Sequence, residues 1–170
     1  MKPILTPERL RVVLNYDAQT GVFTWAKSLS PVAPAGSVAG SVQSEGDIHI
    51  GIDRVYYKAH HLAWLYVTGL WPSSEIDHAN MERTDNRFAN LRLATNQQQA
   101  ANRAVLRNNR LGVKGVGLSY KPKHVSSRYR ARIRVNNKLI HLGYYPTPEA
   151  ANAAYGEAAR QHFGEFARRA

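Results

Sequence analysis

Residues 128–135 alternate strictly between arginine and an apolar or aromatic residue. Arginine occupies the even positions, and the odd positions hold Tyr129, Ala131, Ile133 and Val135. Successive side chains of a β-strand point to opposite faces, so this pattern predicts a strand with one buried face and one cationic face. Such a strand needs neighbouring strands and an apolar cover, which restricts this part of the chain to a sheet packed on one side.

The flanking segments are suited to supply those partners. Asn136-Asn137 fits the positive φ of a two-residue turn, and residues 138–142 are expected to return antiparallel. Residues 112–120 are expected to form a first strand. A helix is predicted between Thr147-Pro148-Glu149 and Gly164, and its many alanines would let it lie close on the sheet. The last part is therefore predicted to be a three-stranded antiparallel sheet packed on one helix.

Basic charge is concentrated in the same region. The net charge is +11, and residues 103–170 account for all of it with fourteen Lys or Arg against three Asp or Glu. Four arginines on one strand face repel one another unless an anion lies opposite, so a polyanion partner is favoured over a solvated strand edge. The absence of cysteine excludes disulfides and thiolate zinc sites, so no structural zinc is expected. No apolar run is long enough to span a membrane, and the first residues do not resemble a signal peptide.

The first part of the chain is expected to hold short mixed elements. Thr6-Pro7-Glu8 predicts a capped helix, residues 47–58 a hairpin, and residues 59–68 a second helix. His60 and His61 lie on that second helix. They are either metal ligands or packing residues, and packing is the more frequent role of a histidine on an apolar helix.

Residues 76–102 hold the groups needed for hydrolysis of a phosphodiester. Asp77 and His78 come first, a polar loop and a short apolar run follow, and a capping-box pattern starts a helix expected from Thr95 to about Arg107. A hairpin folded back on this helix would bring Asp77 near a side-chain carbonyl of the first helical turns. These oxygen ligands suit Mg²⁺. Neutral His78 could then accept the proton of an attacking water.

This stretch resembles the His-Asn-His (HNH) endonuclease motif in the version common in phage free-standing and homing endonucleases. The resemblance rests on Asp77-His78, Asp85-Asn86-Arg87, Asn90-Leu91-Arg92 and Thr95, and it extends upstream to residues 57–62 and 21–25. It implies a ββα-metal finger that holds one divalent cation, Mg²⁺ with Mn²⁺ as a substitute. It also implies roles for three residues: His78 as general base, Asp77 as first metal ligand and Asn90 as the residue that pins the loop.

One signature position departs from the family pattern. The third position is normally Asn or His and ligates the metal, whereas here it is Gln99, which keeps a carbonyl oxygen but adds a methylene. Gln99 is either a ligand with shifted geometry or a solvated helix residue in a degraded site. Asn102, one turn further on, is the alternative ligand. Arg87 and Arg92 either contact phosphate or pair with the aspartates of the finger.

The last part resembles the plant ethylene-response-factor (Apetala-type) DNA-binding domain. Gly115-Val116-Gly117, Tyr129–Arg134, residues 142–151 and Ala154-Tyr155 carry this likeness. The resemblance implies that the open face of the sheet enters the major groove of double-stranded DNA. The residues expected to face DNA, from the resemblance and the alternation together, are Lys114, Arg128, Arg130, Arg132, Arg134 and His141.

These expectations describe an α+β protein with two domains. Residues 1–107 are predicted to be an HNH nuclease domain with its finger core at about residues 76–107 and a hairpin and helix extension before it. Residues 108–170 are predicted to bind DNA. The expected function is metal-dependent cleavage of double-stranded DNA, by a monomer or transient dimer, in the cytoplasm of a bacterium or phage-infected cell. The alternative is a DNA-binding regulator whose nuclease site has decayed, and RNA binding is less favoured because the basic half lacks clustered aromatics for base stacking.

Overall fold

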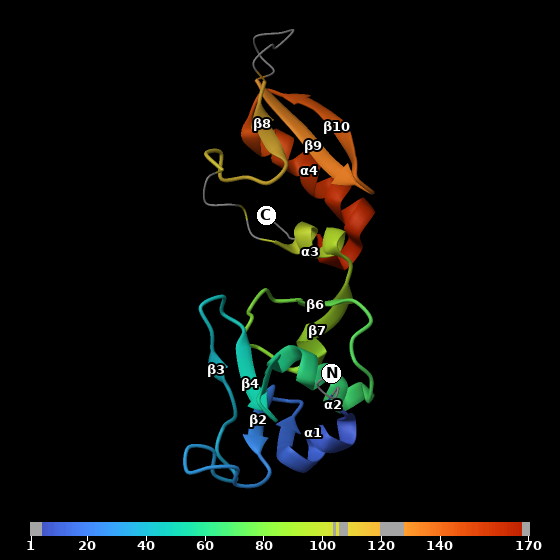
Figure 1. Ribbon diagram of the computed structural model, residues 1–170. Helices are drawn as coiled ribbons and strands as arrows, with labels where there is room; N and C mark the ends of the chain where they lie inside the picture. Colours follow the sequence, from blue (N-terminus) through green and yellow to red (C-terminus); the bar gives the residue numbers. More distant parts are fainter. Residues whose placement is uncertain (1–4, 104, 106–108, 120–127, 168–170) are drawn as a thin grey trace. The chain divides into compact units, whose positions relative to one another are not determined.

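The computed structural model describes residues 5–103, 105, 109–119 and 128–167. The chain forms two compact units, Met1–Ala94 and Thr95–Ala170, and each is described by itself (Figure 1). The expected mixture of helices and small antiparallel sheets is confirmed. The domain boundary expected after residue 107 falls among residues outside those described and stays a prediction. No helix in the described part of the chain has the length and apolar character needed to cross a bilayer.

The first unit contains short helices and three small antiparallel sheets. Strand β1 pairs with β2, β4 lies between β3 and β5, and β6 pairs with β7. The elements are α1 (Pro7–Val13), β1 (Leu14–Asp17), β2 (Val22–Trp25), β3 (Ser41–Val42), β4 (Ile48–Ile52), β5 (Val55–Lys58), α2 (Ala59–Thr68), β6 (Glu75–His78), the 3-10 turn η1 (Phe88–Asn90) and β7 (Leu91–Ala94).

Local sequence signals set most of these boundaries. Helix α1 begins after Thr6, whose hydroxyl accepts a backbone N–H of the first turn, with Pro7 in the first helical position. Helix α2 ends at Gly69, which has φ of +75°. The predicted hairpin turns at Asp53 and Arg54, which both have positive φ. Strand β1 was not predicted, because its apolar positions continue the pattern of α1.

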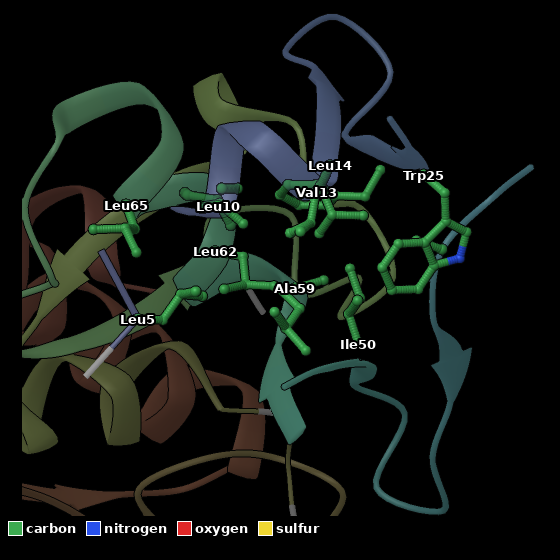
Figure 2. Packing of buried hydrophobic residues seen from close by; sticks show 14 of the residues in the cluster. Leu5, Leu10, Val13, Leu14, Trp25, Ile50, Ala59, Leu62 and Leu65 are labelled. Atoms are coloured by element: carbon green, nitrogen blue, oxygen red, sulfur yellow. The ribbon is translucent and has the colours of Figure 1, made fainter. Parts of the chain in front are cut away.

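Apolar side chains from α1, α2 and the strands form one continuous core in this unit. Leu10, Leu14, Ile50 and Leu62 are completely buried, and Figure 2 shows how they converge from different elements. Full burial of a side chain of this size contributes roughly 1.5–3 kcal/mol. The core therefore gives α2 and the strands beside it a fixed position, on which the polar loop after β6 can be held.

The second unit contains the predicted sheet and helix. The strand order is β10-β9-β8, all antiparallel, and α4 packs against one face of the sheet (Figure 1). On β9, Ala131 and Ile133 are buried while Arg134 is exposed, so the alternation predicted from the sequence is confirmed. The elements are α3 (Asn96–Asn102), β8 (Val116–Leu118), β9 (Tyr129–Val135), β10 (Lys138–Tyr145), α4 (Pro148–Phe163) and the 3-10 turn η2 (Gly164–Phe166).

Three predicted boundaries in this unit were wrong. Helix α3 ends at Asn102, well before residue 107, because Arg103 has an extended backbone. Strand β8 covers only Val116–Leu118 of the expected 112–120, since Gly112 and Gly115 both adopt positive φ. Strand β10 continues to Tyr145 through a register shift after His141.

Candidate functional site

Strand β6 carries the acid and histidine of the predicted site at its C-terminal end. In the antiparallel register with β7, Asp77 lies opposite Arg92 and His78 lies opposite Leu91. The polar loop that follows His78 returns to β7 through η1. Because β-strand side chains alternate, Asp77 and His78 point to opposite faces of this hairpin.

Asp77 and Arg92 form an ion pair across the hairpin. The Nε and Nη2 atoms of Arg92 both donate to Oδ2 of Asp77, at 3.0 and 2.8 Å. Both side chains are largely buried, with exposed fractions of 11% and 16%. Arg87 pairs with both carboxylate oxygens of Asp85, through Nε to Oδ1 and Nη2 to Oδ2, and this contact holds the pKa of the Asp85 carboxyl well below its usual range. Of the two roles considered for these arginines, pairing with the aspartates of the β6–β7 hairpin and its loop is therefore the one observed.

Asn90 ties the two ends of the loop together. Its Oδ1 accepts the backbone N–H of Asn80 at 3.0 Å, and its Nδ2 donates to Asn80 Oδ1 and to the Asp85 carbonyl, both at 2.9 Å. Its own carbonyl accepts the N–H of Ala79 at 2.9 Å. These contacts are those of a residue that holds the loop closed, the role that the resemblance implies. Its place in a catalytic site stays a prediction.

His78 is buried, with 7% of its surface exposed, and the side chains of Asn86 and His60 lie against its ring. Its Nε2 lies 3.3 Å from Oδ1 of Asn86. The ring of His60 meets it edge-on, with centroids 5.0 Å apart and planes at 88°. A buried imidazole held in this way presents one defined orientation to a reacting group.

His60 is a packing residue of this site. It is 5% exposed, and among the described residues its Nδ1 has no hydrogen-bond partner. Burial, with smaller effects from His61 and His78, lowers its pKa from 6.5 to about 3, so the ring is neutral at physiological pH. No group of three or more His, Cys, Asp or Glu suited to a metal occurs in the part of the chain that the structure describes. The burial of His60 and its ring contacts with His61 and His78 agree with the packing alternative.

A buried aspartate outside the predicted site also holds the loop. Asp47 is 4% exposed, and it pairs with Lys58 Nζ at 2.9 Å and with Arg83 Nη1 at 3.8 Å. Burial raises its pKa, but Lys58 and the other cations outweigh this and lower the pKa below its usual value. Arg83, which lies in the loop, also donates to the carbonyl of Glu45. Sequence reasoning missed Asp47, because its partners are far along the chain.

The hairpin β1–β2 holds the other side of the loop. The hydroxyl of Tyr16 donates to the carbonyl of Asn86 at 2.7 Å. Gly21 passes so close that a Cβ on it would lie 2.3 Å from the backbone nitrogen of Arg87, and its φ is +73°. Only glycine permits this approach without displacing the chain. The residues around Gly21 were part of the HNH resemblance, but their contact with Asn86 was not predicted, because the two segments are far apart in the sequence.

The predicted metal ligands are divided between the two units. Asp77 lies in the first unit, whereas Gln99, which is half-buried, and Asn102, which is buried, lie in helix α3 of the second. The chemistry of the donors fits a hard cation, since a carboxylate and an amide carbonyl are oxygen ligands that Mg²⁺ accepts. That these residues share one ion stays a prediction.

Most of the residues expected to face DNA lie on the open side of the β8–β10 sheet. Cross-strand register places His141 beside Arg132, Tyr144 and Gly117 beside Arg130, and Leu139 beside Arg134. The Nε of Arg130 is buried and has no partner among the described residues. A Cβ on Gly117 would be in ordinary van der Waals contact with this nitrogen, at 3.6 Å. Arg128 is exposed and directly precedes β9.

Lys114 has different contacts from those expected of a DNA-binding residue. Its ammonium donates to the carbonyls of Ala100, Ala101 and Arg103 at 2.8, 2.6 and 2.9 Å. These are carbonyls at the C-terminal end of α3, which lack helical partners and carry partial negative charge. Lys114 therefore caps α3 within the second unit, and its assignment to DNA stays a prediction without structural support.

Comparison with known proteins finds a family match for the loop and its hairpin. Residues 57–101 match the family model of the HNH endonucleases. This HNH segment contains α2, β6, the polar loop, β7 and most of α3, including His60, His78 and Asn90. The resemblance expected for this part of the chain is thereby confirmed. The match ends at residue 101, so the Apetala-type resemblance of the last part stays a prediction.

One curated relative agrees with the family match. A protein named uncharacterized HNH endonuclease, from Acanthamoeba polyphaga mimivirus, is 32% identical over 104 residues, which are 61% of this chain and 51% of the relative. The chain thus spans about half the length of that relative. No solved structure matched the chain. The family match and the relative's name both support the prediction of an endonuclease.

Proposed function

We propose that this protein is a DNA endonuclease that hydrolyses phosphodiester bonds with its HNH segment and holds DNA with its C-terminal unit. The observation that carries the proposal is His78, a buried histidine held in one orientation at the end of β6, inside the residues that match the HNH family. Asp77 precedes His78 in the sequence, and Asn90 closes the loop that follows it. Both features support a catalytic role for His78.

His78 acts as the general base in this proposal. It accepts a proton from the water that attacks phosphorus, a step that typically contributes about 10²–10⁴ in rate. Asn90 keeps the loop after His78 closed, so that the imidazole does not move away from the scissile phosphate. A bound divalent cation would stabilise the charge that develops on the phosphate and the leaving oxygen.

Mg²⁺ is the cation that we propose, with Mn²⁺ as a functional substitute. Asp77 would be one protein ligand, and an amide carbonyl of α3, from Gln99 or Asn102, would be the other. Both are hard oxygen donors, and Mg²⁺ usually keeps several waters besides one or two carboxylates. Arg92 holds the Asp77 carboxylate in a fixed orientation. The carboxylate would therefore lose little conformational freedom when the metal binds.

The C-terminal unit supplies DNA affinity in this proposal. Its open sheet face carries Arg130, Arg132 and Arg134 in a row, with His141 on the neighbouring strand. Arginine either reads guanine with two hydrogen bonds or holds phosphate. The HNH segment cannot supply this affinity alone, since residues 57–101 hold four acidic and four basic residues. We further propose that the protein acts in a bacterial or phage-infected cytoplasm, as a monomer or as a transient dimer when both strands are cut.

A plasmid-nicking assay tests the proposal. Supercoiled plasmid is incubated with the full chain in EDTA, in Mg²⁺ and in Mn²⁺, and open-circular and linear products are measured. We expect no cleavage in EDTA and cleavage with 5′-phosphate and 3′-hydroxyl ends in either metal. Cleavage that persists in EDTA would contradict the metal requirement, and no cleavage in any metal would contradict the endonuclease.

A regulator with a decayed nuclease site is the alternative, and Gln99 motivates it. The test is Gln99→Asn, which restores the family's usual amide length at the third signature position. If Gln99 already serves the site, Gln99→Asn changes the cleavage rate by less than about tenfold, the size of a modest ligand effect. A wild type that is inert and a Gln99→Asn variant that cleaves strongly would favour the decayed site instead.

A further inference from the structure

The side chain of Asn86 lies within hydrogen-bond distance of Nε2 of His78, and its amide has one defined orientation. Its Nδ2 donates to the carbonyl of Thr84 at 3.2 Å, and a carbonyl can only accept. The amide oxygen Oδ1 is thereby turned toward His78, 3.3 Å from Nε2. Because Oδ1 can only accept, this contact is a hydrogen bond when Nε2 carries the proton.

We propose that Asn86 is a positioning residue that holds His78 as the Nε2–H tautomer and so makes Nδ1 the nitrogen that accepts the proton from water. A neutral imidazole with hydrogen on one nitrogen has its lone pair on the other. This inference rests on the proposed function, because it names the reacting atom of the same site. Asn86 itself touches neither water nor DNA in this role.

The position of Asn86 is fixed by the fold and not by its own side chain alone. It is 1% exposed. Tyr16 donates to its carbonyl at 2.7 Å, and burial raises the pKa of that tyrosine to about 12, so the hydroxyl remains a donor throughout the physiological range. Gly21 lies against the same backbone, where a Cβ would come within 2.5 Å of the Asn86 carbonyl carbon. Hairpin β1–β2 therefore supports Asn86 from outside the residues that match the HNH family.

This arrangement extends the working site beyond the HNH segment. The chain of contacts runs from β1–β2 through the Asn86 backbone, then through its amide to Nε2 of His78. The ring of His60, which is neutral, also packs edge-on against the ring of His78. These two contacts favour one orientation of the His78 ring. Loss of the Asn86 amide should therefore weaken the orientation of the base without removing the base itself.

The first test observes the tautomer directly. Long-range ¹H–¹⁵N correlation spectra of the full chain are recorded at pH 7.5, with the His78 signals identified by their loss in His78→Ala. We expect a protonated Nε2 and an unprotonated Nδ1, with an Nε2 proton that exchanges slowly. A protonated Nδ1 in the wild type would overturn the inference. This readout needs no cleavage activity.

The second test measures cleavage by variants. Asn86→Ala should lower kcat about 10- to 100-fold, as loss of a supporting contact typically does, while KM for DNA changes by less than about twofold. Asn15→Ala is the matched control, because Asn15 is exposed on β1 beside Tyr16, and it should cleave like the wild type. If Asn86→Ala does not fold, Tyr16→Phe replaces it and should lower kcat in the same direction by a smaller factor.

The outcomes separate this inference from the proposed function. An active wild type whose folded Asn86→Ala variant keeps full kcat would overturn the role of Asn86 and leave the endonuclease standing. A loss seen mainly in KM would also overturn it, since a residue that acts through His78 does not hold DNA. A wild type without cleavage in any metal would refute the endonuclease, and the NMR measurement would still decide the tautomer.

Discussion

At the residue scale, the site depends on hydrogen bonds and contacts between polar side chains that are buried close to one another. His60, His78, Asn86 and Asn90 are all at most 9% exposed, yet they lie beside an apolar core. Buried polar groups are costly unless their partners are present, so such a cluster is stable only in one arrangement. This explains why the loop after β6 is held by several side chains at once.

The buried neutral His60 makes the stability of the protein depend on pH. Its pKa is about 3 in the folded protein and 6.5 when exposed, so the unfolded state binds the additional proton between these values. Protonation of His60 does not reduce the free energy of unfolding above pH 6.5. Below pH 6.5 the free energy of unfolding falls by up to about 1.4 kcal/mol per pH unit. His61, whose pKa burial also lowers, adds to the same trend.

We therefore predict that His60→Phe flattens the acid side of the stability profile. Phenylalanine keeps an aromatic ring against His78 but cannot take up a proton. The free energy of unfolding, measured with urea between pH 7.5 and 5, should fall less steeply in His60→Phe than in the wild type. Equal slopes in the two proteins would show that His60 does not titrate in this way.

At the scale of elements, the sequence predicted best those parts whose signals are local. The capped helices, the Asn136-Asn137 turn and the alternation on β9 depend on neighbouring residues and are as expected. The end of α3 was missed because Lys114, twelve positions beyond Asn102, donates to the last carbonyls of the helix. Asp47 was missed for the same reason, since β5 and the loop after β6 contribute its partners.

Lys114 gives a prediction about α3. Lys114→Met keeps the length of the side chain but removes three hydrogen bonds to α3 carbonyls, and each bond from a charged donor contributes about 1.5–3 kcal/mol. Amide hydrogen exchange in residues 96–103 should become faster. DNA affinity should fall no more than in Lys138→Met, a matched loss of an exposed lysine on β10. A much larger loss of affinity in Lys114→Met would instead support DNA contact by Lys114.

At the scale of the whole molecule, charge was the most informative feature of the sequence. The excess of +11 in residues 103–170 predicted where DNA would bind, and the structure has three of the arginines in a row on one sheet face. The division into units could not be predicted in the same way. Helix α3 follows the finger directly in sequence, but Thr95–Ala170 form one compact unit, and only tertiary contacts such as those of Lys114 reveal this.

The DNA-binding face gives a prediction with a matched control. Arg132→Ala should weaken binding and reduce the slope of log affinity against log salt by about one if Arg132 contacts phosphate. Arg160→Ala removes the same charge from the exposed part of α4, the element that covers the opposite face of the sheet. It should change affinity much less at about 0.15 M salt. Equal losses in the two variants would indicate a general charge effect and not a DNA-binding face.

The central claim is that His78 performs the proton transfer of DNA hydrolysis. The most direct measurement is the single-turnover rate of plasmid cleavage in Mg²⁺ by the wild type and by His78→Ala, each at saturating protein. We predict that the variant binds DNA with affinity within about twofold of the wild type and cleaves about 10²–10⁴ times more slowly. Equal cleavage rates in the two proteins would contradict the account.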